Sequence, residues 1–191
     1  MEDKHKSNSM IVDFSRELEK VDGKAILSKI SEVPHHISQI VKENKVTTAI
    51  QSTQPLPSGV NIRSILENLN VEIISLKEDR IKHRNEIQHI GIGISEADMA
   101  LADTGTIIVN TDREFDRWVT LLPDIYVAIL DSNKIARTLR DLSSSFLDSE
   151  SSNGVKTLSL ITGPSRTADL ELTLVKGVHG PIQVYVIILV D

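Results

Sequence analysis

The run Val184-Tyr185-Val186-Ile187-Ile188-Leu189-Val190 decides the fold class. An uninterrupted apolar run of this length, rich in β-branched residues, is typical of a strand buried on both faces. It is far shorter than the roughly 20 apolar residues that a membrane-spanning helix needs. We therefore expect a central strand of a parallel sheet, and we expect that a chain cut at Pro181 does not fold.

Shorter apolar runs precede this strand and alternate with segments of helical periodicity. Their order predicts βαβ units and a mainly parallel sheet, so the fold class is α/β. Strands are expected at residues 46–50, 71–74, 89–94, 106–109, 125–130 and 158–161. Helices are expected at residues 62–69, 78–88, 135–146 and 168–176, the third of them capped by Asp131 or Ser132.

The beginning of the chain has a different pattern. Residues 11–21 and 26–33 each carry an apolar stripe at helical spacing, and Pro34 opens a third such segment. We therefore expect a helical appendage over residues 1–45 and a single α/β core over residues 46–191.

Composition excludes several classes of protein. The net charge is −6, with 21 basic and 27 acidic residues, which argues against a nucleic-acid partner. The chain has no cysteine, so it forms neither disulfides nor Cys-ligated iron–sulfur clusters by itself. Its first residues lack the apolar core of a signal peptide, and we expect a cytoplasmic protein without a membrane partner.

Three turns carry the residues that suit chemistry. The first is Gly91-Ile92-Gly93-Ile94-Ser95-Glu96-Ala97-Asp98, in which Ser95 and Asp98 have the spacing of a helix capping box. On one interpretation Asp98 only caps that helix. On the other, Glu96 or Asp98 is a carboxylate that faces a pocket and acts as a base or nucleophile.

The second turn is Asp103-Thr104-Gly105-Thr106, in which the glycine ends a short helix and exposes backbone N–H groups that can hold an anion. The third is Gly163-Pro164-Ser165-Arg166-Thr167-Ala168-Asp169, which is expected to open a helix. Its hydroxyls, the positive end of the helix dipole and Arg166 suit a carboxylate or phosphate. The alternative is an ordinary helix cap made by Thr167.

A fourth segment, Lys176-Gly177-Val178-His179-Gly180-Pro181, predicts a tight turn. His179 is a candidate proton carrier, although a single histidine in a turn is also a common structural residue. The other histidines share no ligand spacing, and nucleotide-binding glycine motifs are missing from the sequence. We therefore expect neither a metal nor a cofactor.

The same segments resemble one family. The runs Gly93-Ile94-Ser95-Glu96-Ala97-Asp98 and Asp103-Thr104-Gly105-Thr106 are similar to the signature of the lactate-utilisation C (LUD-domain) family. Arg117-Trp118-Val119-Thr120-Leu121-Leu122-Pro123 resembles a further family segment, with threonine in place of serine. The third turn and Gly177-Val178-His179-Gly180-Pro181 resemble two more. Four segments in the same order make this match specific.

The resemblance implies a twisted sheet with helices on both faces, like that of ribose-5-phosphate isomerase and the CoA transferases. It also implies a role in oxidising L-lactate to pyruvate beside separate iron–sulfur proteins. The leading hypothesis is a non-redox component that binds a small carboxylate or phosphate. The expected ligand-binding residues are Thr104, Gly105, Thr106, Arg117, Ser165, Arg166 and Thr167.

Two alternatives stay open. The first is a stand-alone enzyme of the isomerase or CoA-transferase kind, in which Glu96 or Asp98 is base or nucleophile, Arg166 binds the anion and His179 carries a proton. The second is an interaction module whose N-terminal helices bind a partner. The sequence leaves open whether the chain is an enzyme and whether it forms a homo-oligomer.

Overall fold

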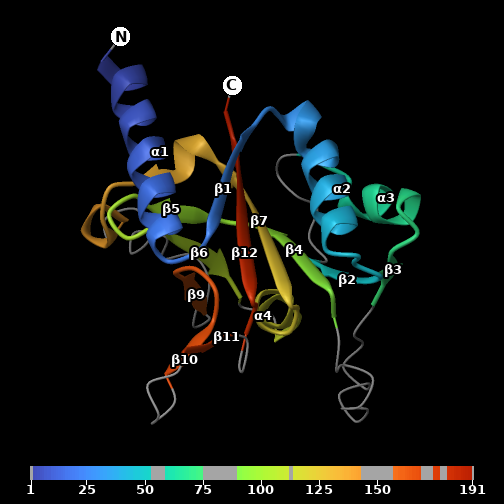
Figure 1. Cartoon of the computed structure of the whole chain (residues 1–191). Coiled ribbons are helices and arrows are strands. Elements are labelled where there is room, and N and C mark those ends of the chain that lie inside the picture. The colour runs from blue at the N-terminus through green and yellow to red at the C-terminus, as the bar shows by residue number, and fades with distance from the viewer. Residues whose placement is uncertain are drawn as a thin grey trace, which may run out of the picture.

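A six-stranded sheet lies at the centre of the molecule (Figure 1). The computed structural model describes residues 2–52, 59–74, 90–111, 114–142, 157–168, 174–176 and 180–190. Every neighbouring pair of strands in this sheet is parallel, which confirms the α/β class. In spatial order the strands are β1 (Lys24–Ser28), β12 (Gln183–Leu189), β7 (Ile125–Asp131), β4 (Ile92–Glu96), β2 (Thr48–Gln51) and β3 (Glu72–Ile73).

Strand β12 lies inside the sheet, between β1 and β7, as its apolar sequence predicts. Its side chains alternate between two separate apolar clusters, one on each face. Val184, Val186 and Ile188 belong to the first cluster, and Tyr185 and Ile187 belong to the second. Burial on both faces explains why the run is apolar except for the hydroxyl of Tyr185, which is hydrogen-bonded to Lys24.

Helices cover both faces of the sheet, as expected (Figure 1). Helices α1 (Glu2–Lys20) and α4 (Glu114–Leu121) pack on one face, where Phe14, Leu18 and Val119 join the first cluster. Helices α2 (Val33–Glu43) and α3 (Ile62–Asn68) pack on the other face, where Ile37 and Leu66 join the second.

A second, four-stranded sheet packs beside α1. Its order is β8 (Ile135–Ala136), β5 (Met99–Leu101), β6 (Thr106–Asn110) and β9 (Leu158–Ile161). Strands β5 and β6 form an antiparallel hairpin, and its Ala100 and Ile107 lie in the first apolar cluster. Strands β10 (Arg166–Ala168) and β11 (Leu174–Lys176) form a separate antiparallel pair.

Several expected helices are strands. The apolar stripe at residues 26–33 belongs to β1 and the short 3-10 helix η1 (Ile30–Glu32), so the first 45 residues contain a strand of the central sheet. Residues 135–136 form β8, and Asp131 caps the 3-10 turn η3 (Ser132–Lys134) instead of an α-helix. Residues 139–142 are helical, so the helix expected at 135–146 is confirmed in that part alone of its described residues. The two ends of the expected helix at 168–176 are β10 and β11. The expected helix at 78–88 lies outside the described residues.

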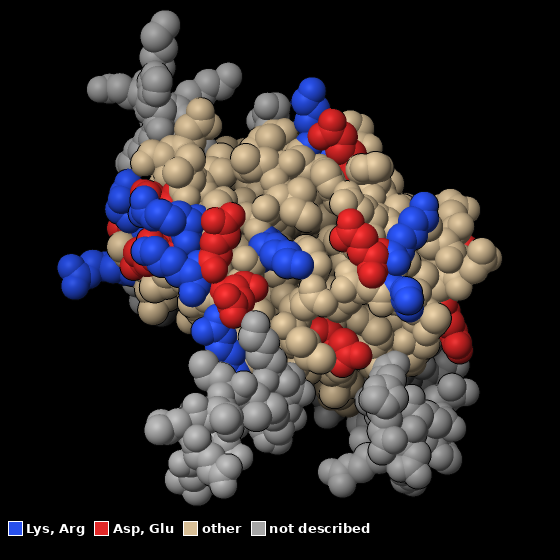
Figure 2. All heavy atoms as spheres, viewed as in Figure 1, with Lys and Arg blue, Asp and Glu red and all other residues tan. Residues whose placement is uncertain are grey.

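Charge is mixed over the surface. On the face in Figure 2, lysine and arginine side chains lie beside aspartate and glutamate, most densely at the side where α1 packs. None of the helices that the structure describes is both long and apolar enough to cross a membrane.

Candidate functional site

Most of the described residues that the sequence singles out lie in two groups, at opposite edges of the central sheet. Glu96 ends β4, so it lies at the edge where the parallel strands have their carboxyl ends. Ser165 donates its backbone N–H to the carbonyl of Pro181, 2.8 Å away and just before β12 begins. The third turn therefore lies at the amino edge, which is opposite to where open α/β sheets bind ligands.

The carboxyl-edge group is built around Glu96 and Lys134. The Lys134 Nζ lies 3.5 Å from the Glu96 carboxylate, and the two side chains are 36% and 11% exposed. Lys134 follows β7, the strand paired with β4, and for this reason the two residues meet. A carboxylate and an ammonium group in contact can exchange a proton with a bound substrate. Sequence reasoning missed Lys134, and its only signal was a basic residue shortly after a buried strand.

Asp98 has a structural contact at this edge. Its Oδ2 accepts the backbone N–H of Asn110 at 2.6 Å, and its own N–H donates to the carbonyl of Ile108. These bonds hold the open end of the β5–β6 hairpin. The expected capping box is wrong, because residues 99–101 form β5 where a helix was predicted.

Beneath this edge, Ser95 and Tyr126 share a buried hydrogen bond. Their hydroxyl oxygens lie 2.7 Å apart, between β4 and β7. Burial raises the pKa of the Tyr126 phenol, the bond to Ser95 opposes that shift, and the negative charge of Asp98 adds to it. The phenol therefore stays protonated at neutral pH and acts as a fixed hydrogen-bonding group.

At the amino edge, three threonine hydroxyls form a chain. The Thr104 and Thr106 oxygens lie 2.8 Å apart, and Thr106 and Thr162 lie 2.7 Å apart. Gly105 stands in the turn of the β5–β6 hairpin with φ +63°, a conformation that favours glycine. The turn at Gly105 thus joins strands β5 and β6, whereas the sequence predicted a short helix before this glycine.

Arg166 already has an anionic partner. Its Nη2 lies 2.8 Å from Oδ2 of Asp22, which follows α1 and has φ +64°. Residue 166 begins β10, so the helix dipole expected at the third turn is missing, and that part of the prediction is wrong. The turn instead offers a guanidinium group and the hydroxyl of Ser165, and Thr162 of the threonine chain precedes it in the sequence.

The β5–β6 hairpin separates the two groups. Asp98 lies at the open end of the hairpin, and Thr104 and Thr106 lie at its turn. A strand rises roughly 3.3 Å per residue, so the open end and the turn are about 10 Å apart. Arg117 is exposed on α4 and shares no described contact with either group. The side chain of Thr167 and the whole of His179 lie outside the described part of the chain.

Gly93 and Gly105, in the first and second turns, are places of close packing. A Cβ on Gly93 would collide with the carbonyl of Val119 and the ring of Pro123, which joins the first turn to the Arg117–Pro123 segment. A Cβ on Gly105 would collide with the backbone of Leu18 in α1. The first turn therefore fits against the Arg117–Pro123 segment and the second against α1, so Gly93 and Gly105 have a structural role.

Comparisons with known proteins agree with this fold. Residues 11–189 match the family model described as LUD domain. The chain is 27% identical to "Lactate utilization protein C" of Halalkalibacterium halodurans, in an alignment that covers 98% of this chain and 82% of the relative. It is 36% identical to "Lactate utilization protein C 1" of Bacillus mycoides, with 81% and 68% covered.

A solved structure supports the architecture independently. The crystal structure of a DUF162 family protein from Deinococcus radiodurans matches with a TM-score of 0.64, covering 96% of this chain and 98% of the other. The two sequences are 16% identical, so this match concerns the fold alone.

Proposed function

Because the chain belongs to the LUD domain family, we propose that it is a non-redox component of a system that oxidises L-lactate to pyruvate. The observation that carries this proposal is the similarity, over 98% of the chain, to a protein named for lactate utilisation. The resemblance of the four sequence segments agrees with it.

The chemistry of lactate oxidation indicates which steps this chain can perform. Oxidation of lactate to pyruvate releases two electrons and two protons, and an electron acceptor must take them up. The chain has no cysteine to hold an iron–sulfur cluster and no recognisable nucleotide motif. We therefore assign the redox step to separate iron–sulfur subunits and a binding or assembly role to this chain.

We assign binding of the small carboxylate to the amino-edge group. The guanidinium group of Arg166 is a fork of donors suited to a carboxylate, and Ser165 precedes it in the chain. The threonine chain ends at Thr162, shortly before this turn in the sequence. In the protein without a ligand, this guanidinium group is paired with the carboxylate of Asp22, whose side chain is 52% exposed. A ligand carboxylate would take its place, so Asp22 sets the affinity of the site.

A genetic experiment tests the pathway. Deleting the gene in the organism of origin should abolish growth on L-lactate and leave growth on glucose unchanged, and a plasmid copy should restore it. A copy carrying Arg166→Gln should restore growth poorly, whereas one carrying Arg63→Gln on α3 should restore it fully. Normal growth of the deletion strain on L-lactate would contradict the proposal.

The contact between Glu96 and Lys134 favours a second candidate, a stand-alone enzyme of the isomerase or CoA-transferase kind. Glu96 is 11% exposed beside a cation at the carboxyl edge, which suits a base or nucleophile. In this case Glu96→Gln should lower turnover by about 10²–10⁴ without unfolding the chain. The change should leave lactate-dependent growth intact if the non-redox role is correct.

A further inference from the structure

Strand β1 is the outermost strand on one side of the central sheet, and it lies between α1 and α2 (Figure 1). Among the described strands it pairs only with β12, and on that side the carbonyl of Ser28 accepts the N–H of Val190. Because backbone groups alternate in direction along a strand, the N–H and C=O groups of Ala25 and Leu27 point away from β12. Within the described part of the chain, these outward groups have no hydrogen-bond partner. A further strand would satisfy them.

The charged side chain of β1 is held away from this edge. The Lys24 Nζ lies 2.9 Å from the hydroxyl of Tyr185 and 4.6 Å from the centre of its ring. It also lies 3.3 Å from Oε1 of Gln183. Both partners belong to β12, on the inner side of β1. Edge strands often carry a lysine that blocks the addition of another strand, whereas Lys24 is bound to its own sheet and leaves the edge open.

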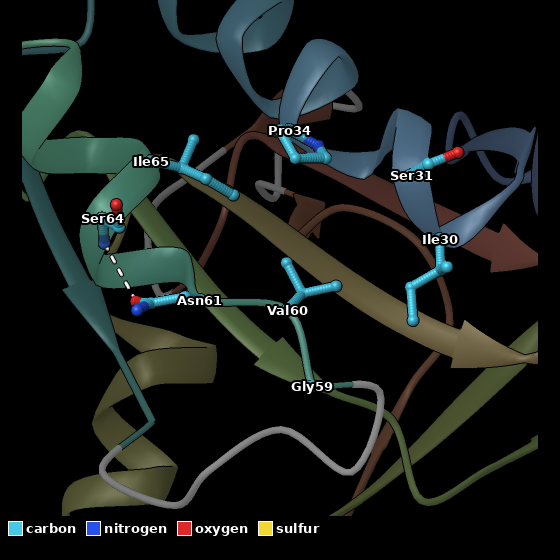
Figure 3. Close-up of a pocket in the computed structure, with 8 residues that line it drawn as sticks. All are labelled: Ile30, Ser31, Pro34, Gly59, Val60, Asn61, Ser64 and Ile65. Atoms are coloured by element: carbon cyan, nitrogen blue, oxygen red, sulfur yellow. Dashed lines mark hydrogen bonds between the residues drawn. The ribbon is translucent and has the colours of Figure 1, made fainter.

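The middle of the strand, Ala25–Leu27, is apolar, and Leu27 is 57% exposed. The next large apolar residue, Ile30, instead lines a cavity of about 330 Å³ together with Pro34 and Val60 (Figure 3). On the face in Figure 2, charged side chains gather toward α1 and leave much of the middle uncharged. The free edge thus combines unpaired backbone groups with an exposed apolar side chain, as a strand-pairing interface does.

We infer that this edge binds a second copy of the chain, and that the two β1 strands pair antiparallel about a two-fold axis at Ile26. This register pairs all five residues of β1 with those of the other copy. Each Ala25 exchanges its outward hydrogen bonds with Leu27 of the other copy, so a small side chain lies beside a large one. Lys24 lies opposite Ser28, so no like charges meet. The inference does not depend on the role in lactate oxidation.

Sedimentation equilibrium of the full chain tests the dimer. The wild type should sediment as a dimer at concentrations on the order of 10 μM. Leu27→Lys places two like charges on one face of the joined sheet, roughly 7–8 Å apart, so the dissociation constant should rise at least about tenfold. The side chain is exposed, so circular dichroism should show an unchanged fold.

Leu160→Lys is the matched control, because Leu160 is 52% exposed on β9 of the second sheet. It should leave the dimer unchanged. A monomeric wild type, or the same dissociation constant for the wild type and Leu27→Lys, would overturn the inference. An equal loss of dimer in Leu160→Lys would also overturn it, because the effect would then not depend on β1.

An engineered cysteine tests the register, because the chain has no cysteine of its own. Ile26 would lie opposite Ile26 of the other copy in a pair without mutual backbone hydrogen bonds, with Cα atoms about 4.5 Å apart, which a disulfide can span. Ile26→Cys should therefore form a linked dimer on mild oxidation, visible on a non-reducing gel and reversed by a thiol. Leu160→Cys should stay unlinked. Absence of the linked dimer in Ile26→Cys, or equal linkage in Leu160→Cys, would overturn the proposed pairing.

Discussion

Arg166 and Asp22 form an ion pair, 2.8 Å between Nη2 and Oδ2, that joins the start of β10 to the end of α1. Sequence reasoning expected Arg166 to bind an anionic ligand at this turn. The ion pair lowers the expected affinity of the site, since an anionic ligand has to compete with the Asp22 carboxylate for the guanidinium group.

Asp22→Asn should therefore raise the affinity of the chain for L-lactate. The gain should be about two- to fivefold, because both side chains are partly exposed and such pairs are worth up to about 1 kcal/mol. Asparagine tolerates the positive φ of residue 22, so the backbone should not change. Isothermal titration calorimetry measures the change.

Arg166→Gln supplies the opposite test, because it removes the guanidinium group and should abolish the binding. The matched control is Arg63→Gln, which removes an arginine from a helical pair with Glu67. Equal affinities in the wild type, Asp22→Asn and Arg166→Gln would exclude the amino-edge site.

Gly105→Ala should destabilise the protein strongly. The residue has φ +63°, which costs a side chain about 1–2 kcal/mol, and its Cβ would collide with the backbone of α1 at a further cost of about 1–3 kcal/mol. Urea unfolding followed by circular dichroism gives the free energy. Gly59→Ala is the control, because φ is +74° but nothing lies within 4 Å of the new Cβ. Similar losses in the two variants would show that close packing at Gly105 is unimportant.

Tyr126 should make stability fall at high pH. Burial raises its pKa in the folded protein, whereas the unfolded phenol ionises near pH 10. The stability that burial of the neutral phenol gives the folded protein is therefore fully present below about pH 10. It is lost as the pH rises further, at up to about 1.4 kcal/mol per pH unit. Urea midpoints at pH 9 and pH 11 should differ more for the wild type than for Tyr126→Phe. Parallel pH profiles of the two proteins would contradict the burial of this phenol.

A chain that ends at Pro181 should not fold. It lacks β12, which pairs with β1 on one side and with β7 on the other and supplies residues to both apolar clusters. A cooperative thermal transition of this truncated chain, with native-like circular dichroism, would show that the strand is dispensable.

The apolar runs predicted every strand of the central sheet except β1, which was expected to be helical. Strands buried on both faces leave a signal that does not depend on their partners. The runs at residues 125–130 and 184–190 are β7 and β12, the two longest strands of the sheet. Most of the shortest strands left no such signal, although the two-residue strand β3 was expected within residues 71–74. Strands β5, β8, β10 and β11 have two or three residues each, and their pairing, rather than local periodicity, determines their conformation.

The candidate site was less predictable for a related reason. Spacing in the sequence located the turns with Glu96, Thr104 and Ser165, but it could not tell which edge of the sheet each turn occupies. Their partners also come from distant segments: Lys134 meets Glu96 and Asp22 meets Arg166 only because strands and helices pack together.

The most direct test of the central claim is lactate-dependent dye reduction in extracts of the deletion strain. Adding the purified chain to this extract should restore dye reduction with L-lactate, and the purified chain alone should give none. Dye reduction by the isolated chain, or an extract that is fully active without it, would contradict a non-redox role in lactate oxidation.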